Sequence, residues 1–364
     1  MVVLGTRPEA IKLAPLIIAL RESGQFRVVT CSTGQHAHMV KPVAEFFGFD
    51  IDRDFGIMKP NQTLNHIVSA TIAAMDVALV EENPDWVVVQ GDTSTTLAAG
   101  LAAFNRKVKI AHVEAGLRTG DISTPFPEEA NRVLVSRIAD IHFPPTALAA
   151  DKLREEGVPE FRIHQVGNTV IDAAEAAVAI NERDTGALDA KFGDLSGGDV
   201  VLFTMHRREN IGEPMERAFG AVAELARNGS RIVFPMHPNP LVREPAQRIL
   251  GGIEGVTLCE PLEYPELVHV LRNCRFVLTD SGGIVEEAAA FSKPAIVLRE
   301  STERTESVDA GSAVLCGTDA DLILSTATEL ASDGDRFRSM SDAPNPFGDG
   351  TSCARIVSIL TRMG

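Results

Sequence analysis

Short apolar runs alternate with amphipathic helical stretches along this 364-residue chain, and the alternation starts again near its middle. The first half predicts strands at 2–4, 27–31, 86–90, 109–113, 141–143 and 163–166, with helices at 12–23, 37–46, 64–82, 93–104, 128–138 and 146–156. The second half predicts strands at 200–204, 231–234, 256–259, 276–279 and 295–298. Strands rich in Val and Ile that alternate with helices are typical of a parallel sheet covered on both faces. We therefore expect an α/β protein of two Rossmann-like, doubly wound domains that face each other across a cleft.

The boundary between the two domains is predicted at Gly167. The segment after it is an Ala-rich helical run that reaches about residue 182, and a polar, Gly-rich stretch at 184–199 follows. The second sheet then starts at Val200. In doubly wound sheets, ligands bind outside the carboxyl ends of the strands, so polar motifs at those ends are the candidates for function.

Composition excludes several classes of function. The net charge of −16 argues against a nucleic-acid partner, which needs a basic patch. The five cysteines form no CxxC pair, and no cluster has the spacing of metal ligands. The sequence shows no signal peptide, and no apolar run approaches the ~18 residues of a membrane span. We therefore expect a cytoplasmic protein without a metal.

The segment Asp280-Ser281-Gly282-Gly283 follows an apolar strand and opens a helix that carries Glu287. A strand, a turn of small residues and a helix N-terminus offer free backbone N–H groups and a positive dipole end to a phosphate. Glu287 lies about one turn into the helix, where a carboxylate can accept hydrogen bonds from ribose hydroxyls. The segment indicates a nucleoside diphosphate site; the alternative is an ordinary turn with a capping serine.

Two cations follow the first strand, and a carboxylate follows the strand at 86–90. Arg7 and Lys12 can reach the cleft from the first helix, unless they belong to a solvated helix start. Asp92 follows the strand at 86–90, where it either caps the next helix or takes part in catalysis. The chain contains no GxGxxG, so a conventional NAD fingerprint is absent.

Two more carboxylates follow in the next strand–loop–helix units. Glu114 directly follows the strand at 109–113 and is expected to face the crevice, the alternative being an ion pair with Arg118. Glu128 and Arg132 are spaced i,i+4 and share a helix face, as an ordinary surface salt bridge also would. Carboxylates that converge beside cations suit acid–base chemistry on an anionic substrate.

Two histidines end strands of the second domain. His206 occupies the position at which the corresponding loop of the first domain has Arg7, and it can donate to a phosphate unless the loop is simply solvated. His237 lies in a proline-rich turn. No G-x-S-x-G elbow accompanies them.

The ordered motifs resemble those of the non-hydrolysing UDP-N-acetylglucosamine 2-epimerases. The matching stretches are GTRPEAIKLAP, QGDTSTTLA, HVEAGLRTGD, PFPEEANR, GNTVIDA, HRREN, DSGGIVEEA, TERTE and NPFGDG, which run from Gly5 to Gly350. The resemblance implies a glycosyltransferase-B-like fold in which the last helix returns to the first domain. It gives a first domain of 1–167 plus 351–364 and a second of 168–350.

The resemblance also implies the reaction, which is reversible conversion of UDP-GlcNAc to UDP-ManNAc without a cofactor. Anti elimination of UDP gives 2-acetamidoglucal, and UDP then adds back. A homodimer is implied as well. The alternatives are a hydrolysing epimerase that releases ManNAc and UDP, a glycosyltransferase of the same fold, and a non-catalytic nucleotide-sugar sensor.

Residue roles carried over from the family fall into three groups. The catalytic carboxylates are Asp92, Glu114 and Glu128. The substrate or diphosphate is contacted by Arg7, Lys12, Arg132, His206, Ser281, Gly282, Gly283, Glu287 and Arg304. The residues matching an allosteric UDP-GlcNAc site are Gln35, Gln62 and His237, and this match is incomplete because Ala37-His38 depart from the family's usual pattern.

Overall fold

The structure, a computed structural model, describes residues 1–34, 37–59, 62–183, 186–193, 195, 197, 199–302, 304–332 and 334–364. The chain forms two compact units. The first comprises Met1–Ala176 with Phe347–Gly364, and the second comprises Ala177–Pro346. The division lies within helix α7 (Thr169–Asn181), whereas the sequence prediction had placed it at Gly167.

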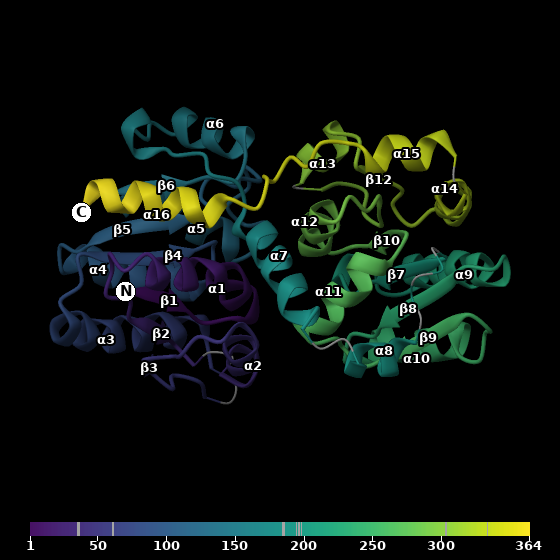
Figure 1. Cartoon of the computed structure of the whole chain (residues 1–364), viewed down its shortest axis with the longest axis horizontal. Helices are drawn as coiled ribbons and strands as arrows, with labels where there is room; N and C mark the ends of the chain where they lie inside the picture. Colours follow the sequence, from purple (N-terminus) through teal and green to yellow (C-terminus); the bar gives the residue numbers. More distant parts are fainter. Residues whose placement is uncertain are drawn as a thin grey trace. The chain divides into compact units, whose positions relative to one another are not determined.

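The first unit is a six-stranded parallel sheet between two layers of helices. Its strands are β1 (Val2–Leu4), β2 (Thr30–Ser32), β3 (Arg53–Asp54), β4 (Trp86–Gln90), β5 (Lys109–Val113) and β6 (Ile141–Phe143). Its helices are α1 (Arg7–Glu22), α2 (Ala37–Phe47), α3 (Leu64–Glu82), α4 (Ser94–Asn105), α5 (Glu128–Ile138), α6 (Ala147–Glu155) and α16 (Ser352–Met363). The strand order is β3-β2-β1-β4-β5-β6, as Figure 1 shows. This is the Rossmann order, which reverses direction between β1 and β4.

Alternate side chains of the central strands explain why both faces are covered. Val3, Val87 and Val89 belong to one core cluster with residues of α3, α4 and α5. Val2 and Val88, which are also buried, lie outside that cluster and point to the opposite face, where α1 packs on α2 and α16. A strand buried on both faces has no polar positions, which is why these segments read as continuous apolar runs.

The second unit repeats the same architecture. Its strands are β7 (Val200–Thr204), β8 (Arg231–Pro235), β9 (Val256–Cys259), β10 (Phe276–Thr279), β11 (Ala295–Val297) and β12 (Ala313–Leu315). Its helices are α8 (Gly186–Phe192), α9 (Glu213–Arg227), α10 (Pro240–Leu250), α11 (Tyr264–Asn273), α12 (Gly282–Ala290), α13 (Thr305–Asp309), α14 (Ala320–Ala331) and α15 (Asp335–Ser341). The order β12-β11-β10-β7-β8-β9 reverses between β7 and β10.

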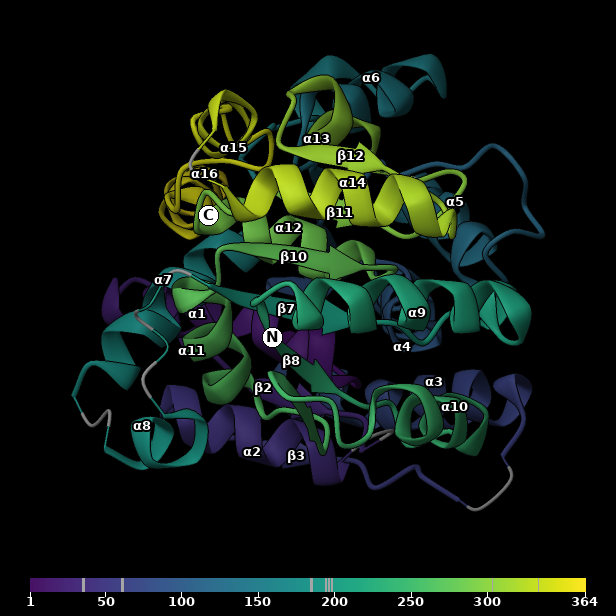
Figure 2. The same ribbon diagram turned by 90° about the vertical axis from the view of Figure 1, so that its right-hand side faces the viewer.

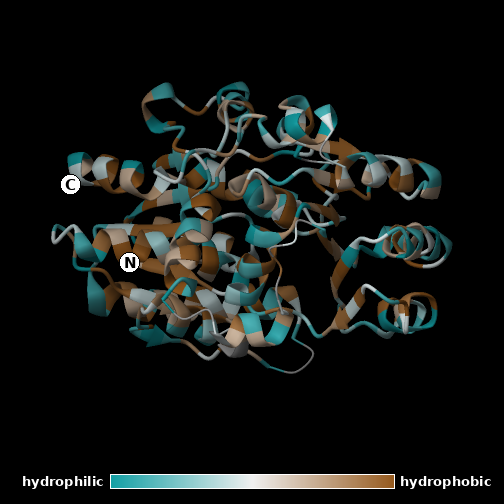
Figure 3. Cartoon of the chain, turned by 45° about the vertical axis from the view of Figure 1, so that its right-hand side comes forward, coloured by the Kyte–Doolittle hydropathy of each residue, from teal (hydrophilic) through white to brown (hydrophobic). Residues whose placement is uncertain are grey.

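Two apolar layers hold the second sheet. Phe203, Phe219 and Phe234 form an aromatic centre against α9, α10 and α14, which lie one above another in Figure 2. Leu202 and Val277 belong to the other layer and pack against α11 and α12. In Figure 3 the strands are largely brown and most helices alternate between brown and teal, as expected for elements with one buried side.

Most predicted elements are confirmed, and the exceptions are short. The segment 163–166 forms only an isolated bridge between His142 and Ile163 instead of the predicted strand. The strand predicted at 27–31 lies at Thr30–Ser32, and the first helix begins at Arg7 instead of residue 12. The edge strands β3 and β12 were not predicted, and no bounds were predicted for the helices α8–α11 and α13–α15. β3 consists of Arg53 and Asp54, so it carries no apolar signal.

Helix α3 contradicts one expectation from composition. By length and composition it could cross a membrane, although no run of that kind had been expected. Met75, Ala78 and Leu79 on its inner side pack into the core beneath the sheet. Its outer side carries Val77 and Val80, which are 56% and 60% exposed.

The five cysteines are free, and four of them are buried. Burial raises the pKa of Cys31 and of Cys274 to about 12, so these thiols stay uncharged. Among the described residues, no three His, Cys, Asp or Glu side chains gather closely enough to hold a metal ion.

Candidate functional site

In the first unit, the predicted residues gather where the strand order reverses. Lys12 on α1 donates to Glu114 at the end of β5, with 2.6 Å between Nζ and Oε1. Gln90, the last residue of β4, donates from its side-chain amide to the other oxygen, Oε2, of Glu114. Glu114 is 7% exposed, so its carboxylate is a nearly buried group held by one cation and one amide. The alternative pairing with Arg118 is wrong, because Arg118 binds Glu156 instead.

The backbone of Glu114 is also unusual. Its φ of +58° lies in the left-handed region, which a non-glycine residue adopts at a cost. Such conformations cluster at functional sites, where the surroundings hold them in place. Gly91, which follows Gln90 on the neighbouring strand, accepts a hydrogen bond of 2.7 Å from the ring of His112. Burial lowers the pKa of His112 to about 4, so the ring is neutral and donates through Nε2.

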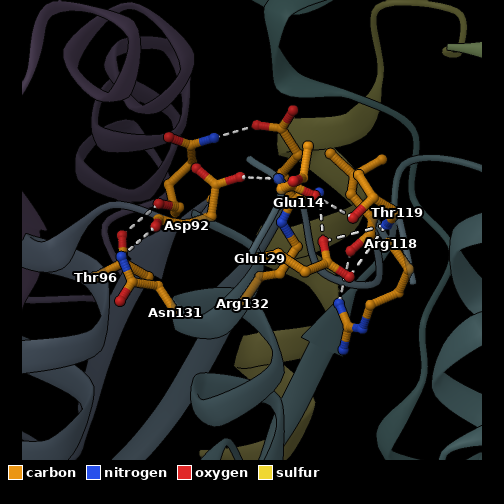
Figure 4. Close-up of polar contacts among 12 residues, drawn as sticks. Asp92, Thr96, Glu114, Arg118, Thr119, Glu129, Asn131 and Arg132 are labelled. Carbon is orange, nitrogen blue, oxygen red and sulfur yellow. Dashed lines mark hydrogen bonds and ion pairs between the residues drawn. The ribbon is translucent and has the colours of Figure 1, made fainter. Parts of the chain in front are cut away.

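A second pair of charges lies beside the first. Arg132 on α5 binds the carboxylate of Asp92 at 2.9 Å and lies 3.4 Å from that of Glu129. Figure 4 shows Arg132 with Asp92 on one side and Glu129 on the other. Asn131 donates to the backbone carbonyl of Asp92 at 2.9 Å, which fixes the turn after β4.

Arg132 keeps donors that the described residues do not satisfy. It is 5% exposed, and its Nε and Nη1 have no hydrogen-bond partner among them. Buried donors of this kind are normally satisfied by water or a ligand. The predicted pairing with Glu128 is replaced by the pairs with Asp92 and Glu129, although Glu128 begins α5 as expected and is half-buried.

The sequence analysis did not identify three buried side chains of this region as functional candidates, namely two carboxylates and one amide. Glu9 is 1% exposed and accepts from the backbone N–H of Gly5 and Thr6 and from the hydroxyls of Thr6, Thr93 and Thr96, at 2.7–3.2 Å. It therefore joins the start of α1 to the start of α4. Glu129 accepts from the backbone of Thr119 and Gly120 and holds the loop after β5. Gln90 is the third, and it belongs to the same QGDTSTT motif as Asp92.

Arg7 is the first residue of α1 and is half-buried, so it lies at the carboxyl end of β1 as expected. A pocket of about 380 Å³ is lined by Glu129, Arg118, Ile122 and Lys152 among others. Its charged lining groups already belong to ion pairs, such as Arg118 with Glu156 and Lys152 with Glu155.

In the second unit, the predicted phosphate-binding segment has the expected form. Ser281 precedes α12, and Gly282 and Gly283 are its first two residues. The first N–H groups of a helix have no partner inside it, so they are available to an anion. The hydroxyl of Thr279 accepts from the backbone N–H of Ser281 at 2.9 Å and orients the turn. Glu287 lies in this helix and is 7% exposed.

The remaining predicted residues of the second unit lie, like Ser281, at the carboxyl-end edge of the second sheet. Arg304 is held by Glu286, which is 1% exposed, through a 2.7 Å ion pair. His206 follows β7 and stacks on His237, with ring centroids 5.6 Å apart and planes at 14°. Among the described residues, these groups line the carboxyl ends of β7, β8, β10 and β11.

Of the three residues that match an allosteric site, the structure describes Gln62 and His237. Gln35 lies outside the described residues. The side-chain amide of Gln62 accepts from the backbone of Lys59 at 3.0 Å and donates to the sulfur of Met58 at 3.1 Å. His237 is exposed and belongs to the ring stack with His206. An allosteric role for these residues stays a prediction.

The chain is similar to known proteins along nearly its whole length. The family model described as UDP-N-acetylglucosamine 2-epimerase matches residues 18–361. A UDP-N-acetylglucosamine 2-epimerase from Yersinia pestis is 43% identical over 366 residues, which cover 99% of this chain and 97% of the relative. The crystal structure of the UDP-GlcNAc 2-epimerase from Neisseria meningitidis bound to UDP-GlcNAc is 39% identical, with a TM-score of 0.92 and 99% of both chains covered. The Methanocaldococcus jannaschii UDP-GlcNAc 2-epimerase in complex with UDP-GlcNAc and UDP is 34% identical, with a TM-score of 0.82 and 99% of both chains covered. The chain therefore belongs to the UDP-N-acetylglucosamine 2-epimerase family.

Proposed function

We propose that this protein reversibly converts UDP-GlcNAc to UDP-ManNAc without hydrolysis. The observation that carries the proposal is the nearly buried Glu114 carboxylate held by Lys12 and Gln90, beside the Asp92–Arg132 pair. Carboxylates and cations in such proximity suit proton transfer on a substrate that itself carries negative charge.

The chemistry explains why cations and carboxylates are both required. The hydrogen on C2 of the sugar is not adjacent to a carbonyl group, so its removal alone is very difficult. When the C1–O bond breaks, its electron pair leaves with UDP and C1 becomes electron-poor. The electrons of the C2–H bond can then form the C1=C2 double bond of 2-acetamidoglucal, while a carboxylate accepts the proton. Addition of UDP and return of a proton to the opposite face of C2 completes the inversion.

The roles proposed for single residues follow from this sequence of events. Asp92, Glu114 and Glu128 serve as the acid–base groups. The N–H groups of the segment 281–283 stabilise the departing diphosphate, and this kind of stabilisation is often the largest contribution to catalysis. Glu287 binds the ribose hydroxyls. Further contacts to substrate or diphosphate come from Arg7, Lys12, Arg132, His206 and Arg304.

The test is a proton NMR time course with UDP-GlcNAc in D2O and no other addition. We expect UDP-ManNAc with deuterium at C2, together with deuterium in the recovered UDP-GlcNAc. Accumulation of free ManNAc and UDP would assign the hydrolysing reaction instead. Binding of UDP without any exchange at C2 would contradict the proposal and favour a glycosyltransferase or a sensor.

We also propose that the protein is a cytoplasmic homodimer. The outer side of α3, α4 and α5 supports a second copy as the partner, because Val77, Val80, Phe104 and Leu134 are each more than half exposed there. Exposed apolar groups on neighbouring helices are typical of an interface. We expect Val80→Glu to convert the dimer to a monomer in light scattering after size exclusion, whereas an unchanged mass would refute this interface.

A further inference from the structure

A buried histidine of β5 contacts the turn that carries Asp92. His112 is 0% exposed, and Nε2 of its ring is 2.7 Å from the carbonyl oxygen of Gly91. A carbonyl oxygen can only accept, so Nε2 carries the proton of this hydrogen bond. Burial lowers the pKa of His112 to about 4, which keeps the ring neutral at pH 7. Nδ1 has no hydrogen-bond partner in the described part of the chain, so the bond to Gly91 is the one polar contact that the ring makes there.

The carbonyl of Gly91 belongs to the peptide that joins Gly91 to Asp92. A peptide unit is planar, so the direction of this carbonyl fixes the direction of the N–H of Asp92 and the starting point of its side chain. Gly91 has φ of +69°, and glycine has more backbone conformations available than other residues. A donor on this carbonyl therefore selects one orientation for a peptide that can otherwise rotate.

The two neighbouring carbonyls of the turn are held in the same manner. The hydroxyl of Thr96 lies 2.6 Å from the carbonyl oxygen of Gln90, and the amide of Asn131, beside Asp92 in Figure 4, donates to the carbonyl of Asp92 at 2.9 Å. Three successive carbonyls thus accept from side chains that belong to α4, β5 and α5. Support from several rigid elements holds a functional side chain more precisely than a loop alone does.

The adjacent strand contains a histidine that is similar but lacks this contact. His142 of β6 pairs in register with His112, and the ring centroids are 6.3 Å apart. His142 is 1% exposed, and burial lowers its pKa to about 3, so its ring is neutral as well. In the structure as described, its ring makes no hydrogen bond to the turn 90–92. The contact with Gly91 therefore distinguishes two histidines that burial and charge do not.

We propose that His112 is a positioning residue for the reaction, acting through Asp92. Its Nε2–H holds the peptide between Gly91 and Asp92 in the orientation that places the Asp92 carboxylate beside Arg132. The ring itself is completely buried and exchanges no proton with the substrate. This inference rests on the function proposed above, in which Asp92 is one of the acid–base groups.

The role predicts a loss of turnover without a loss of substrate binding. In His112→Leu, an apolar side chain of similar bulk replaces the ring and the carbonyl of Gly91 loses its donor. We expect kcat to fall by about 10²-fold, the effect that a displacement of ~1 Å has on a reacting group. The KM for UDP-GlcNAc should change by less than about threefold, because a defect confined to the chemical step leaves binding unchanged.

Two amide variants separate the position of the donor from the bulk of the ring. Glutamine carries its amide nitrogen as many bonds from Cβ as Nε2 of histidine, whereas the nitrogen of asparagine is nearer the backbone. We expect His112→Gln to recover at least about tenfold of the kcat lost in His112→Leu, and His112→Asn to recover none of it. Equal kcat values for the two amide variants would overturn the proposal.

The matched control is His142→Leu, which removes an equally buried ring from the adjacent strand. Its kcat should be unchanged, and a fall as large as that of His112→Leu would overturn the proposal. Each kcat is measured under conditions in which urea unfolding, followed by fluorescence of Trp86, shows the variant to be fully folded. A lower stability alone then leaves kcat unaffected.

A double-mutant cycle on kcat tests whether His112 acts through Asp92. Once Asp92→Asn has removed the carboxylate, its displacement has no further consequence, so His112→Leu should add little loss in that background. The slow residual exchange at C2 in D2O gives the rates of these variants. Additive losses would overturn the proposal.

The hydrogen bond itself can be measured without any variant. Histidine labelled with ¹⁵N in the unaltered protein gives long-range ¹H–¹⁵N correlations for its nine histidines, and through-bond transfer to the backbone assigns those of His112. We expect a neutral ring at pH 7 whose proton lies on Nε2 and exchanges slowly with water. A ring protonated on Nδ1 would overturn the proposal.

Failure of the underlying function gives a different result. An unaltered protein with no exchange at C2 would refute the proposed reaction, while the proton on Nε2 of His112 would still be observed by NMR. An active protein in which His112→Gln is no better than His112→Asn would refute only the role of His112.

Discussion

Replacement of Gly116 by alanine tests how the loop after β5 is held against α6. Gly116 has φ of +92°, and an added Cβ would lie 2.8 Å from the carbonyl carbon of Ala149 and 3.1 Å from Cγ of Leu153. That carbonyl belongs to α6, whose backbone cannot move without breaking the helix. Gly120 in the same loop has φ of +85°, but nothing lies within 4 Å of its added Cβ. The two glycines thus share the backbone conformation and differ in the space around them.

The expected magnitudes follow from this difference. The left-handed conformation costs an alanine ~1–2 kcal/mol, and the smaller unfolded-state effect of Gly→Ala is common to both variants. Overpacking against α6 adds ~1–3 kcal/mol for Gly116→Ala alone. We therefore expect a loss of ~1–2 kcal/mol for Gly120→Ala and of ~2–5 kcal/mol for Gly116→Ala.

The assay is urea unfolding followed by fluorescence of Trp86, the single tryptophan of the chain, which lies in β4 of the first unit. With a slope of ~2 kcal/mol per molar urea, the midpoints of the two variants should differ by ~1 M. Equal midpoints would refute the reasoning, because they would show that α6 yields to the added methyl group.

Three further predictions concern charged side chains of the first unit. Burial raises the pKa of Glu9, so the stability it contributes is present at low pH and lost as pH rises through its folded-state pKa. Glu9→Gln should therefore gain stability relative to the unaltered protein as the pH rises from 4 to 8 in urea unfolding, and a pH-independent difference would contradict this. Lys12→Met should lower kcat by ~10²–10³-fold, because the carboxylate of Glu114 loses its cation; full C2 exchange in D2O would contradict that role. Arg118→Ala should destabilise the first unit by ~1–3 kcal/mol in the same fluorescence assay, since Arg118 is nearly buried and Glu156 then keeps only the longer ion pair with Arg137, and an unchanged midpoint would show that the Arg118–Glu156 pair is not structural.

The sequence predicted the central strands to the residue, and the reason is burial on both faces. β4 and β5 are bounded where predicted because each is a short, mostly apolar segment between polar turns, although β4 ends in Gln90 and β5 contains Lys109 and His112. β3 could not be predicted, since a strand of Arg and Asp is recognised only through its pairing with β2. The segment 163–166 has the composition of a strand, yet only Ile163 pairs with β6. Pairing at an edge depends on tertiary contacts that local composition does not contain.

The candidate site was predicted in position but not in its pairings. The carboxyl ends of β1, β4 and β5 follow from strand order, so Asp92 and Glu114 were expected near one another. The partner of Glu114 was not, because Lys12 stands 102 residues away in the sequence. Local spacing suggested Arg118 as the partner of Glu114. Arg118 instead forms an ion pair with Glu156, from another element. Local spacing likewise suggested Arg132 as the partner of Glu128, but Arg132 forms its closer ion pair with Asp92, also from another element.

The return of α16 to the first unit affects the order in which the protein can be made. Asp172 accepts from the backbone N–H of Cys353 at 2.8 Å, and α16 packs on α1, so residues 347–364 complete a unit that otherwise ends at Ala176. At a translation rate of ~5–20 residues per second, the ribosome needs roughly 10–35 s to synthesise the second unit before these residues emerge. During that interval the apolar face of α1 that receives α16 is uncovered, and chaperones have their best opportunity to bind the nascent chain.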